Sequence, residues 1–309
     1  MTLRVGTSIL DLIGLTPLLR LAEIEPAGGA EIWAKLEYLN PGGSVKDRAA
    51  LGLIRAGEAQ GHLVPGGVII EPTAGNTGIG LALIGRRLGY RVILVVPANF
   101  SREKMVLMQA LGGELVITPE ELGMKGAIAR AHQLAGELPD AWVPQQFENQ
   151  ANPEYHYEHT AAELWEQTSG RADAIVMGAG TGGTFSGIVR YFRDRGVAAR
   201  GVLVEPQGSI WGGGPPGPHL VEGIGNSFWP GTLHRDLVDE VIMVRDEPAL
   251  ATALDLARRC GVLAGGSGGA AANAAIQVAA RLAPGQRVLT LIPDAAERYM
   301  SKGMYGDIR

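Results

Sequence analysis

The sequence is short of cysteine and of excess positive charge, and each shortage excludes a class of protein. Cys260 is the single cysteine among 309 residues. One thiol permits neither an intrachain disulfide nor a cysteine-based zinc site, and free cysteines are most often buried, so we interpret Cys260 as a small hydrophobe in a reducing compartment. Lys and Arg total 27 against 32 Asp and Glu, a net charge of −5. This balance argues against a nucleic-acid partner.

Long hydrophobic runs are also missing. No apolar run approaches the ~18 residues of a membrane span, and the first residues do not show the cationic-then-apolar pattern of a secretion signal. We therefore expect a cytoplasmic protein with no membrane partner. Hydrophobic residues make up 46% of the chain and charged residues 19%. That composition can bury a large core, which excludes a disordered chain.

Short apolar runs alternate with longer segments of helical period, a pattern that predicts an α/β fold. The apolar runs lack polar alternation, as in a sheet covered by helices on both faces. Strands are expected at 32–36, 68–71, 92–96, 115–118, 174–177, 201–205, 241–244 and 288–292. Helices are expected near 46–60, 77–88, 101–111, 124–138, 154–168, 184–195, 247–260, 268–282 and 295–302. Two domains fit this length, each with a central, mostly parallel sheet covered by helices.

Glycine is abundant, with 45 residues gathered in short runs. The clearest run, GAGTGGT at 178–184, lies between an expected strand and an expected helix, where backbone amides and the helix dipole favour an anion. Its GxGxxG spacing over 178–183, with Glu205 ending the next strand, also fits an NAD-dependent oxidoreductase. Thr181 and Thr184 add hydroxyl donors, which suit a terminal phosphate better than a bridging pyrophosphate.

Three further segments carry candidate chemistry. The sequence TAGNTG at 73–78 could hold a carboxylate at a helix start, or Thr73 or Asn76 could simply cap that helix. Lys46 follows a Pro-Gly-Gly-Ser turn and opens a helix. A lysine is usually a solvated surface charge, but an enclosed one can form a Schiff base and move protons. Ser267, within GGSGG, offers one hydroxyl to a ligand or caps a helix.

A Schiff-base lysine, a phosphate loop, an asparagine and a single hydroxyl together match pyridoxal 5′-phosphate and no step of hydride transfer. The chain resembles the cysteine synthase/cystathionine β-synthase family, whose members are fold type II pyridoxal-phosphate enzymes. The matching segments run in order along nearly the whole chain. They are IGLTPLLRL (13–21), KLEYLNPGGSVKDRAA (35–50), EPTAGNTGIGLA (71–82), QFENQANP (146–153), GAGTGGT (178–184), VEGIG (221–225), GVLAGGSGGAA (261–271) and PDAAERYMSK (293–302).

The resemblance implies a role for each candidate residue, and none for a metal. Lys46 would form the internal aldimine and remove the substrate Cα proton, Asn76 would bind the 3′-oxygen, and Ser267 would face the pyridine nitrogen. The phosphate would be held by five residues, namely Gly180, Thr181, Gly182, Gly183 and Thr184. The substrate carboxylate would be bound by Thr73, Gly75, Asn76, Thr77 and Gln146. Gly223, in the 223–225 loop, would line the amino end of the substrate.

The resemblance also implies domain bounds, a reaction and partners. A large phosphate-binding domain would comprise 1–44 and 148–309, and a small mobile domain, 45–147, would carry the substrate loop. The reaction would be β-replacement on O-acetyl-L-serine through an α-aminoacrylate, giving cysteine from sulfide and cystathionine from homocysteine. A pyridoxal-phosphate serine/threonine dehydratase and the NAD-dependent oxidoreductase are the alternatives. A homodimer is expected, and serine acetyltransferase is a partner to test.

Some positions depart from most cysteine synthases. Ala74 replaces a serine, GGSGGA replaces GISSGA, and Ala295 and Ala296 replace a Ser-Gly pair. With TAGNTG, SREK, GMKGAI, VEGIG and YMSK, the chain looks more like the bacterial O-acetylserine-dependent cystathionine β-synthases of this family. Small residues at 74, 265, 266, 268, 269, 295 and 296, with the 208–218 loop, are expected to leave room for homocysteine. The sequence does not fix the preferred nucleophile or leaving group.

Overall fold

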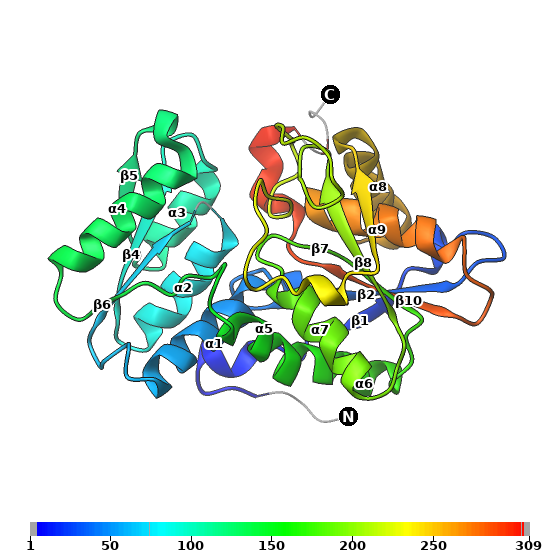
Figure 1. The fold of residues 1–309 in the computed structure, drawn as a ribbon, viewed down its shortest axis with the longest axis horizontal. Helices are drawn as coiled ribbons and strands as arrows, with labels where there is room; N and C mark the ends of the chain where they lie inside the picture. The colour runs from blue at the N-terminus through cyan, green and yellow to red at the C-terminus, as the bar shows by residue number, and fades with distance from the viewer. Residues whose placement is uncertain (1–4, 74, 304, 306–309) are drawn as a thin grey trace. The chain divides into compact units, whose positions relative to one another are not determined.

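The computed structural model describes residues 5–73, 75–303 and 305, so the departure at Ala74 lies outside the described residues. The chain divides into two compact units (Figure 1). Unit 1 comprises Met1–Ile13 and Lys46–Asn152, and unit 2 comprises Gly14–Val45 and Pro153–Arg309. The expected division differs at residues 1–13 and 148–152, which it joined to the larger domain, and at residue 45, which it joined to the smaller one. At the start of the chain the physical reason is that Ile13 is buried in the hydrophobic core of unit 1.

Unit 1 is built on a four-stranded parallel sheet in the order β5-β4-β3-β6. Its strands are β3 (Val68–Pro72), β4 (Arg91–Pro97), β5 (Glu114–Thr118) and β6 (Ala141–Trp142). Its helices are η1 (Ile9–Leu12), α1 (Lys46–Ala59), α2 (Asn76–Arg87), α3 (Arg102–Ala110), η4 (Glu120–Leu122) and α4 (Gly123–Glu137). Alternate strand residues point to opposite faces. Ile69 and Leu94 accordingly pack in the cluster that includes α1 and α2, whereas Ile70 and Ile93 pack against α4.

Unit 2 contains a six-stranded sheet in the order β1-β2-β10-β7-β8-β9, in which β1 alone is antiparallel to its neighbour. The strands are β1 (Leu18–Arg20), β2 (Glu31–Leu36), β7 (Ala174–Gly178), β8 (Arg200–Pro206), β9 (Glu240–Val244) and β10 (Arg287–Ile292). The longer helices that pack in this unit are α6 (Ala162–Thr168), α7 (Gly183–Asp194), α8 (Asp246–Cys260) and α9 (Gly266–Ala279). Short helical segments are η2 (Ala22–Ile24), η3 (Glu37–Leu39), α5 (Ala151–Tyr155), η5 (His156–Ala161), η6 (Arg235–Leu237) and η7 (Ala296–Lys302).

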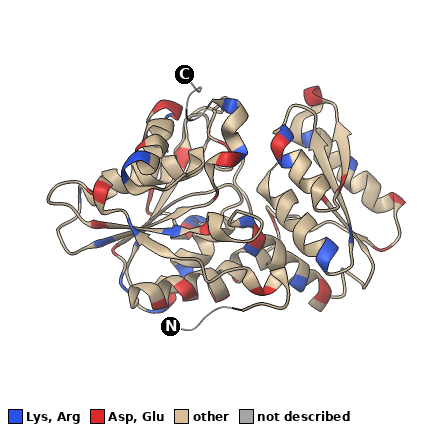
Figure 2. Ribbon diagram, turned by 180° about the vertical axis from the view of Figure 1, so that it is seen from behind, with Lys and Arg blue, Asp and Glu red and all other residues tan. Residues whose placement is uncertain are grey.

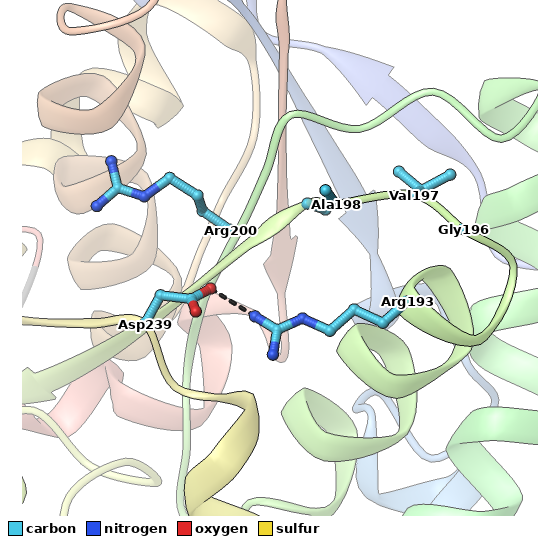
Figure 3. A pocket seen from close by; sticks show the side chains of 7 residues that line it. Arg193, Gly196, Val197, Ala198, Arg200 and Asp239 are labelled. Atoms are coloured by element: carbon cyan, nitrogen blue, oxygen red, sulfur yellow. Dashed lines mark hydrogen bonds and ion pairs between the residues drawn. The ribbon is translucent and has the colours of Figure 1, made fainter.

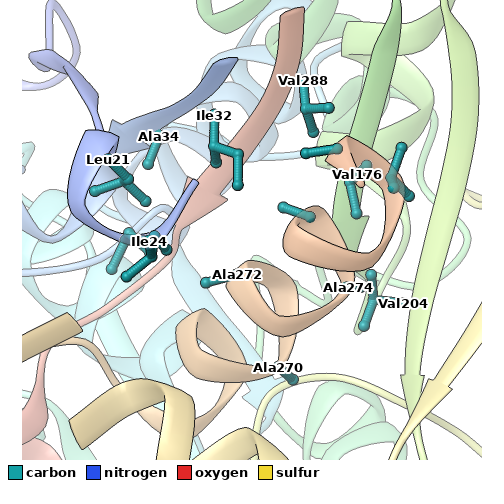
Figure 4. Close-up of a cluster of buried hydrophobic side chains, with 14 of the residues drawn as sticks. Leu21, Ile24, Ile32, Ala34, Val176, Val204, Ala270, Ala272, Ala274 and Val288 are labelled. Atoms are coloured by element: carbon teal, nitrogen blue, oxygen red, sulfur yellow. The ribbon is translucent and has the colours of Figure 1, made fainter. Parts of the chain in front are cut away.

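Helix α9 packs against the sheet of unit 2 through small side chains. Its buried face is made of alanines such as Ala272 and Ala274, which lie against Ile32, Val176 and Val288 in one cluster (Figure 4). Small side chains allow the helix axis to approach the strands, so the core here is dense without large aromatic residues.

The expected strands are all present, and the expected helices differ in two places. The helix predicted at 154–168 contains a π-helical turn, His156–Ala161, and the helix predicted at 295–302 is a 3₁₀ helix. Strands β1 and β6 were not predicted because β1 has three residues and β6 has two, which is too short for a periodic pattern. Acidic and basic residues are interspersed along the helices (Figure 2). Among the described helices, none combines the length and the apolar character needed to cross a bilayer.

Candidate active site

The predicted site residues lie at the carboxyl ends of parallel strands in both units, the usual ligand-binding edge of such sheets. In unit 1, Thr73 follows β3 and Gln146 follows β6, which pairs with β3. In unit 2, the 178–184 loop follows β7, and Ala264, just before α9, bridges Ala295 beyond the end of β10. Each unit therefore brings its own predicted residues to one edge of its sheet.

Lys46 is the first residue of α1, and Asn76 is the first residue of α2. These two helices pack closely through Gly80, one turn into α2. A Cβ at Gly80 would lie 3.0 Å from the Lys46 carbonyl oxygen and 3.1 Å from the Ala50 Cβ. Glycine at this position lets the first turns of α1 and α2 lie side by side, with Lys46 and Asn76 both partly accessible.

The predicted carboxylate-binding residues of unit 1 include a buried hydrogen-bonded pair. The Thr77 hydroxyl donates to Gln146 Oε1 at 2.6 Å. Asn152 Nδ2 donates to the Gln146 carbonyl oxygen at 3.0 Å, which holds the backbone of the same residue. Thr73 Oγ1 accepts from the amide of Gly75 at 3.3 Å. Gly75 occupies the cap position of α2 without a side-chain cap, so neither Thr73 nor Asn76 acts as a simple helix cap.

A buried carboxylate that sequence reasoning missed lies behind this pair. Glu71, inside β3, is 1% exposed and accepts the amide of Gln145 at 3.3 Å. It also accepts hydrogen bonds from the backbone and the side chain of Gln146. Burial raises the pKa of Glu71 to about 8, although these hydrogen bonds lower it. The sequence feature that could have indicated this buried carboxylate is the acidic residue within the otherwise apolar run VIIEP.

In unit 2, the backbone of the 178–184 loop leaves room only for glycine at two positions. Gly182 caps α7 with φ of 88°, and a Cβ there would lie 2.3 Å from the Leu233 Cβ. At Gly180 a Cβ would lie 2.5 Å from the Gly223 carbonyl oxygen. The backbone of the loop therefore packs directly against the backbone of the 223–225 segment, and a side chain at position 180 would prevent this contact.

Side chains from neighbouring segments fix this loop further. Asn226 Nδ2 donates to the Gly180 carbonyl at 2.5 Å, and the Thr232 hydroxyl donates to the Thr181 carbonyl at 2.6 Å. Thr184 Oγ1 lies 3.1 Å from His156 Nε2. His156 was not predicted from the sequence, because its partner is 28 residues away and only the fold brings the two together.

Ser267 is buried in the first turn of α9, and Gly265 rather than Ser267 occupies the cap position. The capping alternative for Ser267 is therefore wrong. Gly265 faces protein, since a Cβ there would collide with the carboxylate of Asp294. Gly269 likewise faces the Ala249 carbonyl oxygen, at 2.2 Å from the built Cβ.

The expectation that small residues around Ser267 leave room for homocysteine is not supported by these contacts. Gly268 faces Ala264 and Ile292, and Ala295 and Ala296 are each 4% exposed. These residues, like Gly265 and Gly269, serve helix and strand packing. A glycine run in a sequence does not reveal whether the missing side chain would have faced a ligand or the protein.

Glu205 does not have the role that an NAD-binding site would require. Its carboxylate accepts the amides of Trp211 at 2.9 Å and Gly212 at 2.8 Å, and the residue is 2% exposed. The carboxylate therefore closes the turn after β8 and is not directed at a ribose. This local geometry argues against the oxidoreductase alternative.

A surface pocket of unit 2 lies at the opposite edge of the sheet from the 178–184 loop. It is lined by Arg193, Arg200, Asp239 and the 196–199 segment, near the amino ends of β8 and β9 (Figure 3). Arg193 pairs with Asp239 at 2.5 Å, and Arg200 pairs with Glu240 at 3.0 Å. These ion pairs occupy the two cations, and the predicted site residues lie elsewhere.

The fold is that of a pyridoxal-phosphate enzyme of fold type II. A family model described as "Pyridoxal-phosphate dependent enzyme" matches residues 9–294, and the chain belongs to that family. It is 45% identical to the O-acetylserine dependent cystathionine β-synthase of Bacillus subtilis, over 97% of both chains. It is 44% identical to a cysteine synthase of Staphylococcus aureus, over 96% of both. The crystal structure of an O-acetylserine dependent cystathionine β-synthase from Helicobacter pylori superposes with a TM-score of 0.93, at 43% identity, covering 98% of this chain and 100% of that one.

The residues present fit pyridoxal phosphate. Loop 178–184 contains no acidic residue and combines the amino end of the 12-residue helix α7 with two threonine hydroxyls, a donor set suited to a phosphate dianion. Ser267 is buried and neutral, which suits a pyridine nitrogen. Lys46 supplies a primary amine at the accessible start of α1.

Proposed function

We propose that this chain catalyses β-replacement on O-acetyl-L-serine, using pyridoxal 5′-phosphate, to form L-cysteine from sulfide and cystathionine from homocysteine. The observation that carries the proposal is the 45% identity, over 97% of both chains, to a relative named as an O-acetylserine dependent cystathionine β-synthase. The similarity to a cysteine synthase supports sulfide as an acceptor.

We assign the cofactor contacts by role. Lys46 holds the cofactor covalently and then moves the substrate Cα proton through its Nζ atom. The cofactor, when bound, stabilises the electron pair that remains after this proton leaves. Asn76 hydrogen-bonds the 3′-oxygen, Ser267 faces the pyridine nitrogen, and Gly180–Thr184 hold the phosphate. Because Ser267 is neutral, it does not hold the pyridine nitrogen protonated as an aspartate would. That difference favours loss of a β-substituent over racemisation or transamination.

The substrate carboxylate is assigned to the amino end of α2. Thr73, Gly75, Asn76 and Thr77 contribute the loop and the first amides of that helix, where the dipole favours a negative charge. Gln146 joins them through its contact with Thr77 at 2.6 Å. Gly223, exposed and with φ of 86°, is assigned to the amino end of the substrate.

The two acceptors differ in size. Sulfide needs little room, whereas homocysteine brings a carboxylate and an ammonium group of its own. A site open to the larger thiol is therefore open to the smaller one. The 208–218 loop, largely exposed, remains the candidate for accommodating homocysteine now that Gly265, Gly268 and Gly269 are found to face protein.

The test begins with the purified protein as it is expressed. It should be yellow, and borohydride reduction followed by peptide mapping should locate a pyridoxyl group on Lys46. O-Acetylserine should then be turned over with sulfide and with homocysteine in parallel assays, with serine and O-phosphoserine as alternative donors. The variant Lys46→Ala should lose turnover while keeping its circular dichroism spectrum. Colourless protein, or a label elsewhere than Lys46, would refute the assignment.

Three expectations concern the surroundings of the enzyme. We propose a homodimer, a cytoplasmic location and serine acetyltransferase as a partner to be tested. We also propose that the part of unit 1 within 45–147 moves as substrate binds. Light scattering of the purified protein, cell fractionation, co-purification with an acetyltransferase and hydrogen exchange with and without O-acetylserine test these four points separately.

A further inference from the structure

We propose that Glu71 is a positioning residue for recognition of the substrate carboxylate, acting by fixing the side-chain amide of Gln146. The inference rests on the proposed function for the identity of the substrate. Its physical basis is a chain of hydrogen bonds, all within unit 1, that runs from Glu71 through Gln146 to Thr77.

Beside β3, the Glu71 side chain accepts backbone hydrogen bonds beyond the point where strand β6 ends. The ladder between β3 and β6 pairs Val68 with Ala141 and Ile69 with Trp142, and no further pair follows. Two residues beyond, the Glu71 carboxylate accepts the amide of Gln145 and that of Gln146. A buried acceptor thus satisfies amides that the short strand β6 leaves beyond its end.

The backbone at this point needs such support. Gln145 has φ of 55°, an unusual conformation for a residue with a side chain. The hydrogen bond from its amide to Glu71 holds the chain in this turn. This turn directs the next residue, Gln146, back toward the start of α2, where its side chain accepts the Thr77 hydroxyl.

The two ends of the Gln146 amide are distinguished by their partners. Its oxygen accepts the Thr77 hydroxyl, and its nitrogen donates to the Glu71 carboxylate. An amide nitrogen carries two hydrogens and a hydroxyl carries one. Thr77 therefore donates its single hydroxyl hydrogen to Gln146. We assign the second amide hydrogen of Gln146 to the substrate carboxylate.

Only an acid at position 71 suits this arrangement. Three N–H groups converge on the side chain, and a carboxyl group offers acceptor lone pairs on both of its oxygens even when it is protonated. Glutamine at the same position would turn an NH2 group toward those donors, or would give them a single oxygen to share. The Glu71 side chain is itself buried within β3, and this burial raises the pKa of Glu71 to about 8.

The first experiment compares Glu71→Gln with the parent holoenzyme. We expect an unchanged cofactor spectrum and unchanged borohydride labelling of Lys46, together with a KM for O-acetylserine raised roughly tenfold and a smaller change in kcat. The hydrogen bond that would be misdirected is the one from Gln146 to the charged substrate carboxylate, and loss of such a bond typically weakens binding by a factor of this size. Glu114→Gln is the matched control, because Glu114 lies in the same sheet but pairs with Arg91 at the surface, 51% exposed. Its KM should stay within twofold of the parent value.

The second experiment isolates the carboxylate and does not depend on turnover. L-Alanine and L-alaninamide are titrated against the cofactor spectrum of both proteins. Selective weakening of alanine in Glu71→Gln, with alaninamide unchanged, supports the proposal. Equal weakening of both ligands, or of neither, overturns it. If the parent binds alanine but does not turn over O-acetylserine, the proposed function fails while this comparison still decides the role of Glu71.

Two further variants guard against a folding defect. Glu71→Asp keeps the carboxyl group but shortens the reach, so it should show an intermediate, still selective, loss. In a double-mutant cycle, Glu71→Gln and Thr77→Val should be non-additive, because both act through Gln146. Additive losses, or a Glu71→Asp enzyme with the parent's alanine affinity, contradict the proposed chain.

Discussion

His156 Nε2 lies 3.1 Å from the hydroxyl oxygen of Thr184, at the start of α7, while the other ring nitrogen lies 2.9 Å from the hydroxyl oxygen of Thr160. His156 is buried and begins the π-helical turn that packs on α7. If Nε2 carries the proton, the ring donates to Thr184 and leaves the single hydroxyl hydrogen of Thr184 for an anion. In that tautomer the imidazole sets the direction in which Thr184 donates.

Removal of this imidazole is expected to weaken cofactor binding. In His156→Ala the apoenzyme should bind pyridoxal phosphate roughly 2- to 12-fold more weakly, the equivalent of one hydrogen bond worth about 0.5–1.5 kcal/mol. Fluorescence titration of the apoenzyme measures the change. Thr184→Val should give a loss at least as large, and the double variant should lose little more than Thr184→Val alone. An unaltered affinity in His156→Ala would show that Thr184 does not need the ring.

Gly182 is expected to be irreplaceable for two separate reasons, its φ of 88° and its contact with Leu233. Gly89 is a matched control, with φ of 90° and no atom within 4 Å of a built Cβ. Gly89→Ala should cost about 1–2 kcal/mol of unfolding free energy from backbone strain alone. Gly182→Ala should cost more, by roughly 1–3 kcal/mol for the overlap, and should release the cofactor. Denaturant unfolding and absorbance of the dialysed proteins test both points. Equal costs would mean that the loop moves freely away from Leu233.

The stability of the protein should depend on pH through Glu71. Burial raises the pKa of Glu71 from 4.5 to about 8 in the folded chain. Below pH 4.5 the carboxyl is protonated in both states and contributes its full stability. Between pH 4.5 and 8 the unfolded chain releases a proton that the folded chain keeps, so the unfolding free energy falls by up to about 1.4 kcal/mol per pH unit. Above pH 8 the contribution is lost and levels off.

The pH dependence is isolated by comparison with a variant that does not titrate. Unfolding curves of the parent and of Glu71→Gln, recorded from pH 5 to 8, should converge or cross as the parent loses stability. Their difference contains the contribution of Glu71, since other titrating groups are common to both. Parallel curves across this range would mean that Glu71 titrates near its ordinary value.

Asn76 provides a test of the substrate loop that is separate from Gln146. Asn76→Ala should slow the conversion of O-acetylserine by roughly 10- to 150-fold, the range for a lost hydrogen bond to a charged group of about 1.5–3 kcal/mol. Cofactor content should change far less, because Lys46 and the 180–184 loop remain. Single-turnover absorbance changes measure the conversion. A variant with the parent's rate would reduce the loop to a helix start.

The fold was predictable from the sequence because its signals are local. The run VILVV predicted β4, and the glycine loop after AIVMG predicted the turn from β7 to α7. The contacts of Glu71 and His156 were not predictable in this way, since they join residues 74–75 and 28 positions apart. Strand β6 was missed for another reason: two residues are held in place by β3, and their own sequence carries no pattern.

The small residues of α9 have a consequence for how this scaffold can change over evolutionary time. Ala272, Ala274 and Gly269 are each packed against strands or α8, so a larger side chain at any of them is selected against as a folding defect before it can alter catalysis. Gly214, in the exposed 208–218 loop, has its nearest contact 3.6 Å from a built Cβ and tolerates substitution. We therefore expect substitutions that alter the choice of thiol acceptor to be tolerated in that loop and not at these positions of the helix that carries Ser267.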